Sequence, residues 1–217
     1  MDGISWLLRG LPVMTGELPG FDLDDTPAEP RELFLRWLGE AVAAGVREPH
    51  VMSVATVDQD ALPDVRVLVL RDLDARGWQF VTDRTSAKGR HLTAHPAAAL
   101  GFHWREQGRQ IRVRGHVFDL GVSAAADDFL ARSPAARLAS LSSAQSDVIT
   151  DPENEGLARS EAQRLIDEDP GFVPAGHVVY ALDPVSVEFW QGDADRRHVR
   201  LRYRRSADEW IKERLWP

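Results

Sequence analysis

The chain has 217 residues, of which 43% are hydrophobic and 28% charged, as is usual for a soluble globular protein. Its net charge of -8 and pI of about 5.4 argue against nucleic acid or an anionic membrane as the main partner. The absence of cysteine excludes disulfides, a thiol nucleophile and zinc–cysteine sites, and no apolar run approaches the roughly 20 residues of a membrane span.

Residues 1–28 are predicted to form an N-terminal arm with little regular structure, because they carry Pro and Gly and become acidic toward their end. Five side chains in the arm are too apolar to remain in water: Trp6, Leu7, Leu8, Leu11 and Val13. We therefore expect the arm to pack on the body of the chain or on a second subunit. Asp2 stands where a signal peptide would have a basic leader, so we expect a cytoplasmic protein.

A helix is predicted from Pro30 to Val46, since proline suits a first turn and Gly45 suits the C-terminal end. Its apolar face comprises Leu33, Phe34, Trp37, Leu38, Ala41 and Val42. The run 51–57 predicts a strand, and a turn at 58–60 leads into an antiparallel return strand.

That return strand opens a central stretch, residues 65–90, which predicts strand, turn, strand and the start of a helix over 85–95. Arg66 interrupts an aliphatic run, so it needs an anionic partner or an exposed edge. Amides, hydroxyls and a cation at a helix N-terminus can bind an anion. The residues that this stretch offers to a phosphate are Arg66, Thr82, Ser86 and Lys88. The alternative is an N-capped surface helix with solvated charges.

Two further strands are predicted at 97–104 and 109–117, joined by a turn at 105–108. Gln110, Arg112 and Arg114 share one face of the second strand, while Ile111 and Val113 face the core. The polar face is either the solvated side of an edge strand or the lining of a cofactor site. His91 and His95 have the spacing of a metal pair, but without a nearby third ligand we expect exposed histidines and no metal.

The rest of the chain predicts three helices followed by four strands. The helices are 123–130, 135–143 and 155–166, and the strands are 177–182, 185–190, 198–204 and 209–214. About eight short strands with interposed helices indicate an α+β protein built on an antiparallel barrel. Residues 29–217 are expected to form one domain. The chain lacks a Gly-rich dinucleotide fingerprint, a P-loop and a Gly-x-Ser-x-Gly elbow.

Near the C-terminus, Trp190 is followed by a turn at 192–195 and by Arg196, Arg197, His198 and Arg200. Such a cluster of cations beside a Trp and a His is unusual in an acidic protein and indicates a functional site. The alternative is a charged edge hairpin, in which arginine prevents sheet pairing.

Eight motifs recur in the order found in one known family. They are ATVD (55–58), RVLVLR (66–71), TSAKGR (85–90), WREQGRQIRVRG (104–115), the pair Gln145–Ser146, VEFWQG (187–192), RRHVR (196–200) and RLWP (214–217). From about Pro30 to Pro217 the chain resembles the pyridoxamine 5'-phosphate oxidase family of FMN enzymes. This resemblance implies an antiparallel split barrel with peripheral helices, and a homodimer with FMN at its interface.

The resemblance also implies the residues that hold FMN. They are Arg66, Val67, Leu68, Val69, Leu70, Arg71, Val81, Thr82, Ala87, Lys88, Gln110, Gln145, Ser146, Trp190 and Arg200. Val81 and Ala87 stand where the family often has an aromatic residue and an arginine. Arg66 and Lys88 remain to carry the charge of the FMN phosphate, so we expect FMN binding to be retained.

The implied substrate site departs further from the family. The positions that grip the substrate phosphate in the vitamin-making members are here Arg71, Asp128, Arg132 and Ala136. Asp128 is expected to repel a phosphate, and Ala136 removes a donor. Arg196, Arg197 and His198 lie at positions expected over the substrate, where Arg196 and His198 would orient it and assist proton removal.

The segment GVREPHVMSVATVD (45–58) and the WRE turn resemble a second branch of the family, the flavin oxidases of phenazine biosynthesis. The leading hypothesis is therefore an FMN-dependent oxidase. It would transfer a hydride from a reduced nitrogen heterocycle to FMN, with O2 as acceptor and hydrogen peroxide as product. One alternative is a pyridoxine/pyridoxamine 5'-phosphate oxidase that makes pyridoxal 5'-phosphate. Another is a non-catalytic flavin- or haem-binding split-barrel protein.

Overall fold

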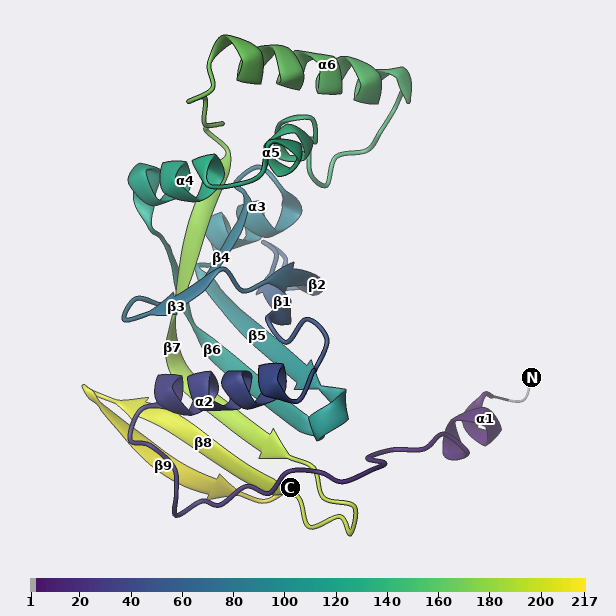
Figure 1. Cartoon of the computed structure of the whole chain (residues 1–217), viewed down its shortest axis with the longest axis vertical. Helices are drawn as coiled ribbons and strands as arrows, with labels where there is room; N and C mark the ends of the chain where they lie inside the picture. Colours follow the sequence, from purple (N-terminus) through teal and green to yellow (C-terminus); the bar gives the residue numbers. More distant parts are fainter. Residues whose placement is uncertain (1–2) are drawn as a thin grey trace. The chain divides into compact units, whose positions relative to one another are not determined.

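The computed structural model describes residues 3–217 (Figure 1). The helices of this part are α1 Ser5–Arg9, α2 Pro30–Ala43, α3 Ala87–Ala94, the 3-10 helix η1 Arg105–Gln107, α4 Gly121–Leu130, α5 Pro134–Leu141 and α6 Glu153–Glu168. The strands are β1 Val51–Val57, β2 Pro63–Val69, β3 Asp72–Asp74, β4 Gly77–Asp83, β5 Ala97–Trp104, β6 Arg109–Asp119, β7 His177–Gln191, β8 Val199–Ser206 and β9 Glu209–Leu215.

The nine strands of the described chain form one sheet in the order β2-β1-β5-β6-β7-β4-β3, and β8 pairs with β7 and with β9. The pairs β3–β4, β4–β7, β7–β8 and β8–β9 are antiparallel. Because β6 lies between β5 and β7, the polar face with Gln110, Arg112 and Arg114 does not belong to an edge strand. The edge-strand interpretation of that face is therefore wrong.

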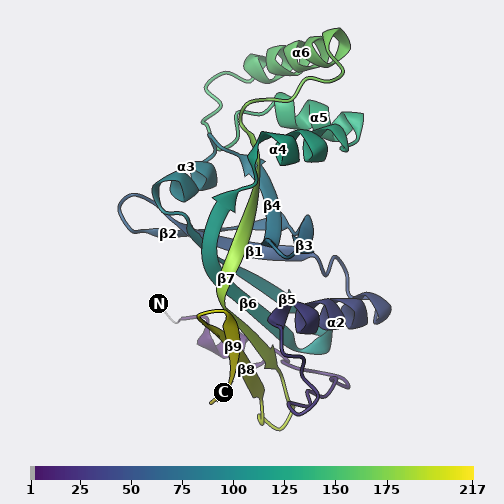
Figure 2. The same cartoon turned by 90° about the vertical axis from the view of Figure 1, so that its left-hand side faces the viewer.

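The two strands predicted at 177–182 and 185–190 are one continuous strand, β7, which Figure 2 shows in side view. It pairs with β4 as far as Leu182 and with β8 from Ser186 onward, so its partner changes around Asp183 and Pro184. Gly115 makes this passage possible, since a Cβ there would lie 2.0 Å from the Asp183 carbonyl oxygen. The sequence predicted two strands because proline is rare inside a strand, and Pro184 lies within β7.

The contact pattern divides the chain into two compact units. The first contains the chain up to Met52, with Gly101–Val113 and Val185–Pro217. The second contains Ser53–Leu100 and Arg114–Pro184.

In the first unit, α2 buries Leu33, Phe34, Trp37 and Ala41. The Phe34 and Phe102 rings meet edge to face with centroids 4.9 Å apart, and Trp37 meets Phe189 at 5.2 Å. Val42, predicted for the same face, is instead 62% exposed, and the helix ends at Ala43, before the predicted Val46. Gly45, with a φ of 73°, ends this segment in the left-handed conformation that favours glycine.

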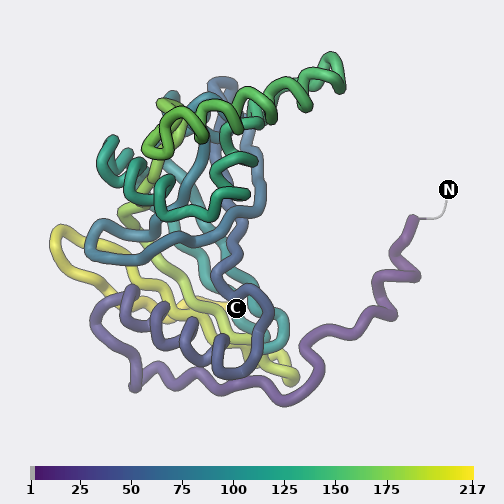
Figure 3. The backbone as a smooth tube through the Cα atoms, turned by 45° about the horizontal axis from the view of Figure 1, so that its top comes forward, coloured from purple at the N-terminus to yellow at the C-terminus, as the bar shows by residue number. Residues whose placement is uncertain are grey.

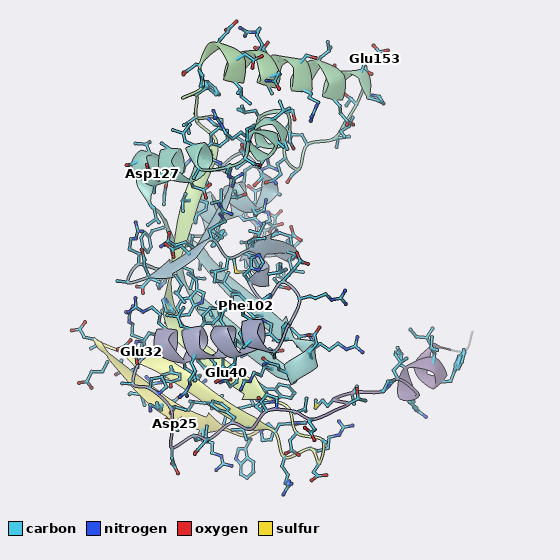
Figure 4. All side chains as sticks on the ribbon, in the orientation of Figure 1. Asp25, Glu32, Glu40, Phe102, Asp127 and Glu153 are labelled. Carbon is cyan, nitrogen blue, oxygen red and sulfur yellow. The ribbon has the colours of Figure 1, made fainter. Side chains whose placement is uncertain are left out.

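A buried arginine also anchors α2, whose Glu32 and Glu40 are labelled in Figure 4. Arg109 is 2% exposed, and its Nη1 lies 2.6 Å from Glu40 Oε2. Its Nε donates to Gln191 Oε1, and its guanidinium carbon lies 4.2 Å from the centroid of Trp37. These contacts satisfy a charge that would otherwise be costly to bury.

The N-terminal arm contains the short helix α1 and extends away from α2 (Figure 3). The five apolar side chains Trp6, Leu7, Leu8, Leu11 and Val13 are 73%, 50%, 53%, 55% and 61% exposed, respectively. These five side chains do not pack on the body of their own chain, but the later part of the arm does: Phe21 meets Trp37 edge to face at 4.8 Å, and the Tyr203 hydroxyl donates to the Pro27 carbonyl oxygen. Packing on a second subunit stays a prediction.

In the second unit, β4 buries Trp78 and Phe80 and leads directly to α3. Ser86 is the N-cap of α3, and its Oγ accepts from the Gly89 amide. A Cβ on Gly89 would lie 2.4 Å from the Arg84 carbonyl oxygen, so only glycine lets the helix start this close to β4. Tight packing of strand against helix therefore places Thr82, Ser86 and Lys88 together.

Candidate functional site

Five polar residues lie together at the N-terminus of α3, in the second unit, and Arg66 on β2 is near enough for its charge to lower the pKa of Lys88. We call Arg66, Thr82, Ser86, Lys88, Gln145 and Ser146 the α3 cluster. Lys88 is 6% exposed, and its Nζ donates to Gln145 Oε1 at 2.7 Å and to Ser86 Oγ at 3.3 Å. Within residues 3–217 no carboxylate forms an ion pair with Lys88. Burial, and then the charge of Arg66, lower the pKa of Lys88.

Hydroxyl and amide groups complete the cluster. The Thr82 hydroxyl lies 3.2 Å from Ser86 Oγ and donates to Gln145 Oε1 at 3.3 Å. Ser146 Oγ accepts from the Ala87 amide at 3.2 Å, and Ser146 has a φ of 80°. Gln145 and Ser146 also line a cavity of about 740 Å³ formed by α5, α6 and the loop between them. Two neutral oxygens of this loop, Gln145 Oε1 and Ser146 Oγ, thus accept hydrogen bonds from Lys88 and from the Ala87 amide.

Arg66 lies on β2, at one end of the sheet order, with its guanidinium turned toward β1. Its Nη1 donates to the Val54 carbonyl oxygen at 3.0 Å and to Thr56 Oγ1 at 2.7 Å, while Nη2 pairs with Asp64. Both conditions predicted for an arginine in this strand, an edge position and an anionic partner, are confirmed. Asp64 is largely exposed, so it is a weak competitor for an added anion.

The α3 cluster fits an anionic group such as a phosphate. The Lys88 ammonium is buried and hydrogen-bonded only to neutral oxygens, so it can donate a charge-assisted hydrogen bond to an anion. The charge of Arg66 is close by, and Lys88 lies at the N-terminal, positive end of α3. The interpretation of α3 as a surface helix with solvated charges is wrong for Lys88, which is buried. The other predicted cofactor residues of this unit lie on β2 (Val67, Leu68 and Val69), directly after it (Leu70 and Arg71), on β4 (Val81) and at the start of α3 (Ala87). Val67 and Val69 are exposed, and Leu68, Leu70 and Val81 are half-buried.

A second group of predicted residues lies in the first unit, around Trp190 and His198. Their ring centroids are 4.9 Å apart, with the planes inclined at 43°. The Asp193 amide donates to His198 Nδ1 at 3.0 Å. A neutral imidazole that accepts at Nδ1 carries its proton on Nε2. In this arrangement His198 offers a donor at Nε2, which suits orienting a substrate better than removing a proton from it.

Arg200 is held in an ionic network. Its Nε and Nη2 donate to Glu188 Oε1 at 3.1 and 2.8 Å, and its Nη1 donates to the Trp216 carbonyl oxygen. Arg112 pairs with the other oxygen of Glu188, which is buried. Arg112 thus belongs to a network in this unit, and Gln110 shares its face of β6. Arg196, with a φ of 66°, and Arg197, paired with Asp195, are exposed.

A third group, again in the second unit, is centred on Asp128 of α4. Arg71 Nη2 lies 3.0 Å from Oδ1, Arg132 Nε 3.0 Å from Oδ2, and His177 Nε2 2.9 Å from Oδ2. Burial alone would raise the pKa of Asp128. The hydrogen bond with His177 and the charges of Arg132 and Arg71 outweigh that effect and hold it far below its usual range. Ala136, by contrast, is exposed in the first turn of α5.

Sequence reasoning missed three residues that complete these groups: Thr56, His177 and Glu188. Thr56 bridges Arg66 and His91, His177 is the third partner of Asp128, and Glu188 joins Arg112 to Arg200. Asp128 and His177 are 49 positions apart, so no local pattern links them. Of the three, only Glu188 could have been found from the sequence, because a carboxylate in the otherwise apolar strand segment VEFW needs a cationic partner.

Among the described residues, no group of three His, Asp or Glu side chains could hold a metal ion. No helix in residues 3–217 is both long and apolar enough to cross a membrane. Of the two histidines at this spacing, His91 on α3 is half-buried and hydrogen-bonded to Thr56, so the expectation that it is exposed is wrong, whereas His95 is the exposed C-cap of the helix.

Comparison with known families gives two matches. Residues 38–152 match the family model of pyridoxamine 5'-phosphate oxidase. Residues 177–217 match the pyridoxine 5'-phosphate oxidase C-terminal dimerisation region.

Individual relatives align over nearly their whole length. A pyridoxine/pyridoxamine 5'-phosphate oxidase of Pseudomonas syringae pv. tomato is 42% identical over 195 residues, 88% of this chain and 90% of the relative. One from Bradyrhizobium diazoefficiens is 35% identical over 210 residues, 95% of each chain.

The crystal structure of PhzG from Burkholderia lata 383, in complex with tetrahydrophenazine-1-carboxylic acid, superposes with a TM-score of 0.85. It is 36% identical and covers 93% of this chain and 100% of that one. An FMN-binding protein related to pyridoxamine 5'-phosphate oxidase, from Nostoc punctiforme, has the same fold with a TM-score of 0.70 at 22% identity. These likenesses confirm the predicted α+β fold, an antiparallel split barrel with peripheral helices.

Proposed function

Because the chain belongs to the pyridoxamine 5'-phosphate oxidase family, we propose that this oxidoreductase is an FMN-dependent oxidase acting on a reduced nitrogen heterocycle that carries no phosphate. When bound, FMN accepts a hydride and passes the electrons to O2, with hydrogen peroxide as product. The protein works as a homodimer, in keeping with the dimerisation region that residues 177–217 match.

The α3 cluster holds the FMN phosphate in this proposal. Lys88 Nζ and the Arg66 guanidinium supply the charge, and Thr82, Ser146 and the first amides of α3 supply neutral donors. Lys88 Nζ and the Ala87 amide donate to Gln145 and Ser146. Phosphate oxygens of FMN would replace these acceptors or share the same donors. The proposed cofactor set is completed by Trp190, Arg200 and Gln110 of the first unit and by Arg71 and Val81 of the second.

The Asp128 group is the observation that carries the substrate assignment. Two arginines that could receive a substrate phosphate already share one carboxylate, and His177 satisfies its second oxygen. A phosphate would have to approach a fixed negative charge at the same donors. A neutral heterocycle avoids this penalty, and one with a single carboxylate incurs less of it than a phosphate with up to two negative charges. The solved PhzG structure, which contains tetrahydrophenazine-1-carboxylic acid, supports a substrate of that class in specialised metabolism.

Arg196 and His198 would lie against such a substrate. Arg196 is exposed and can pair with a carboxylate, and His198 offers its Nε2 proton to a ring nitrogen or an oxygen. Tilted against Trp190, the imidazole has a defined orientation for this contact.

A second candidate is pyridoxine/pyridoxamine 5'-phosphate oxidase, because curated relatives at 42% identity carry that name and Arg71 and Arg132 are both present. In this case Asp128 would have to release its arginines when substrate binds.

Substrate oxidation distinguishes the candidates. The FMN-loaded protein is mixed anaerobically with a tetrahydrophenazine carboxylate or with pyridoxine 5'-phosphate, and flavin absorbance is followed before and after admission of air. We expect only the phenazine-type compound to bleach the flavin rapidly, and air to restore the colour with release of peroxide. Rapid formation of pyridoxal 5'-phosphate at micromolar substrate would establish the second candidate instead. No bleaching by either compound would favour a non-catalytic flavin-binding protein.

A further inference from the structure

We propose that His91 is a positioning residue, which holds the guanidinium of Arg66 through the hydroxyl of Thr56 and so sets the affinity for the FMN phosphate. The inference rests on the proposed function, since it concerns how the α3 cluster is kept ready for that phosphate. His91 itself need not touch the cofactor.

The three side chains form a chain of hydrogen bonds across three elements. Arg66 Nη1 on β2 donates to Thr56 Oγ1 on β1 at 2.7 Å, and Thr56 Oγ1 lies 3.0 Å from His91 Nδ1 on α3. Thr56 is 1% exposed, so water cannot substitute for either partner. His91 is half-buried and comes from the helix whose N-terminus carries Lys88.

The direction of each hydrogen bond follows from the chemistry of the groups. An arginine nitrogen is always a donor, so Thr56 Oγ1 accepts at that contact. The single hydroxyl proton of Thr56 then needs an acceptor, because a buried hydroxyl without one is costly. Among residues 3–217, the other side-chain partner of this oxygen is His91 Nδ1. In this proposal Nδ1 of His91 receives the Thr56 proton, and the imidazole carries its own proton on Nε2.

This arrangement links the two cationic parts of the cluster. The Thr56 hydroxyl and the Val54 carbonyl oxygen fix one edge of the guanidinium, and both belong to β1. Without the acceptor on α3, the hydroxyl would turn toward the Val54 side or lie unpaired, and Arg66 would follow Asp64 toward solvent. A preorganised donor binds an anion more tightly than a mobile one.

The test compares FMN affinity in His91→Leu, His91→Gln and Thr56→Val with the natural protein, by quenching of flavin fluorescence. Glutamine can accept the Thr56 proton and leucine cannot. We expect the dissociation constant for FMN to rise about tenfold in His91→Leu and in Thr56→Val, and to change less than about threefold in His91→Gln. His95→Leu, the same substitution at the exposed C-cap of α3, is the matched control and should leave affinity unchanged.

A double-variant experiment shows whether His91 acts through Arg66. In an Arg66→Ala background, His91→Leu is expected to have almost no further effect on FMN affinity. A full tenfold loss in that background, or His91→Gln as weak as His91→Leu, would overturn the proposal. Failure of the natural protein to bind FMN would refute the proposed function itself. Normal FMN binding with no loss in His91→Leu would refute only the role of His91.

Discussion

Replacing Lys88 with methionine is expected to weaken FMN binding about 10- to 100-fold, because it removes a charge-assisted contact worth roughly 1.5–3 kcal/mol. Methionine keeps the apolar stem of the side chain, so the main change is the loss of the Nζ ammonium group. The lowered pKa of Lys88 means that the fold disfavours its charged form. The apoprotein should therefore unfold at the same temperature as the natural protein or at a higher one, while the cofactor dissociates more readily.

A matched control is available because the chain contains just one other lysine, Lys212. Its Nζ donates to the carbonyl and hydroxyl oxygens of Thr26, in the first unit. Lys212→Met removes the same formal charge and should leave FMN affinity within about twofold of the natural protein. Equal FMN affinities in Lys88→Met and the natural protein would show that the phosphate is bound elsewhere.

Replacing Asp128 with asparagine is expected to lower the free energy of unfolding by about 2–3 kcal/mol at neutral pH. The substitution leaves Arg71, Arg132 and His177 without the carboxylate that holds them, and His177 is buried. Urea unfolding followed by tryptophan fluorescence measures the difference.

The destabilisation should depend on pH in one direction. The pKa of Asp128 in the folded chain is lowered relative to the unfolded chain. Its contribution is therefore complete above an unfolded pKa of about 3.9 and is lost as the pH falls below that value. The stability gap between the natural protein and Asp128→Asn is expected to close as the pH falls from 5 toward 2.

Glu161→Gln provides the control, since Glu161 pairs with Arg164 on the surface of α6 and is more than half exposed. This change should alter stability by less than about 0.5 kcal/mol. An Asp128→Asn protein as stable as Glu161→Gln would refute the role given to the Asp128 group.

The same variant tests the substrate assignment. Asparagine frees Arg71 and Arg132 for an added anion, so the KM for pyridoxine 5'-phosphate should fall about tenfold or more. An unchanged or higher KM would mean that Asp128 does not exclude phosphate.

Much of the fold followed from local chemistry that the sequence displays. Pro30 and Gly45 mark the two ends of one helical segment, and Ser86 caps α3 as its position suggested. The predicted strands at 51–57 and 97–104 have the predicted bounds. Each of these depends on residues within a few positions of one another, where propensity and capping decide the conformation.

Features that depend on distant residues were not predictable. The continuity of β7 through Pro184 needs Gly115 on another strand, and the burial of Lys88 needs Gln145 from a loop far along the chain. The group of hydrogen-bonding side chains around Asp128 includes His177, which no sequence spacing connects to α4. Motif resemblance named Lys88 and Asp128, but only the structure shows that one is a buried cation without a carboxylate partner and the other a carboxylate shared by two arginines.

The central claim is that the α3 cluster binds the phosphate of FMN. The direct measurement is titration of the apoprotein with FMN and with riboflavin, which has the same ring system but no phosphate. Two charge-assisted contacts predict that FMN binds at least about 100-fold more tightly, and that Lys88→Met and Arg66→Ala each reduce this preference. Equal affinities for FMN and riboflavin in the natural protein would contradict the claim.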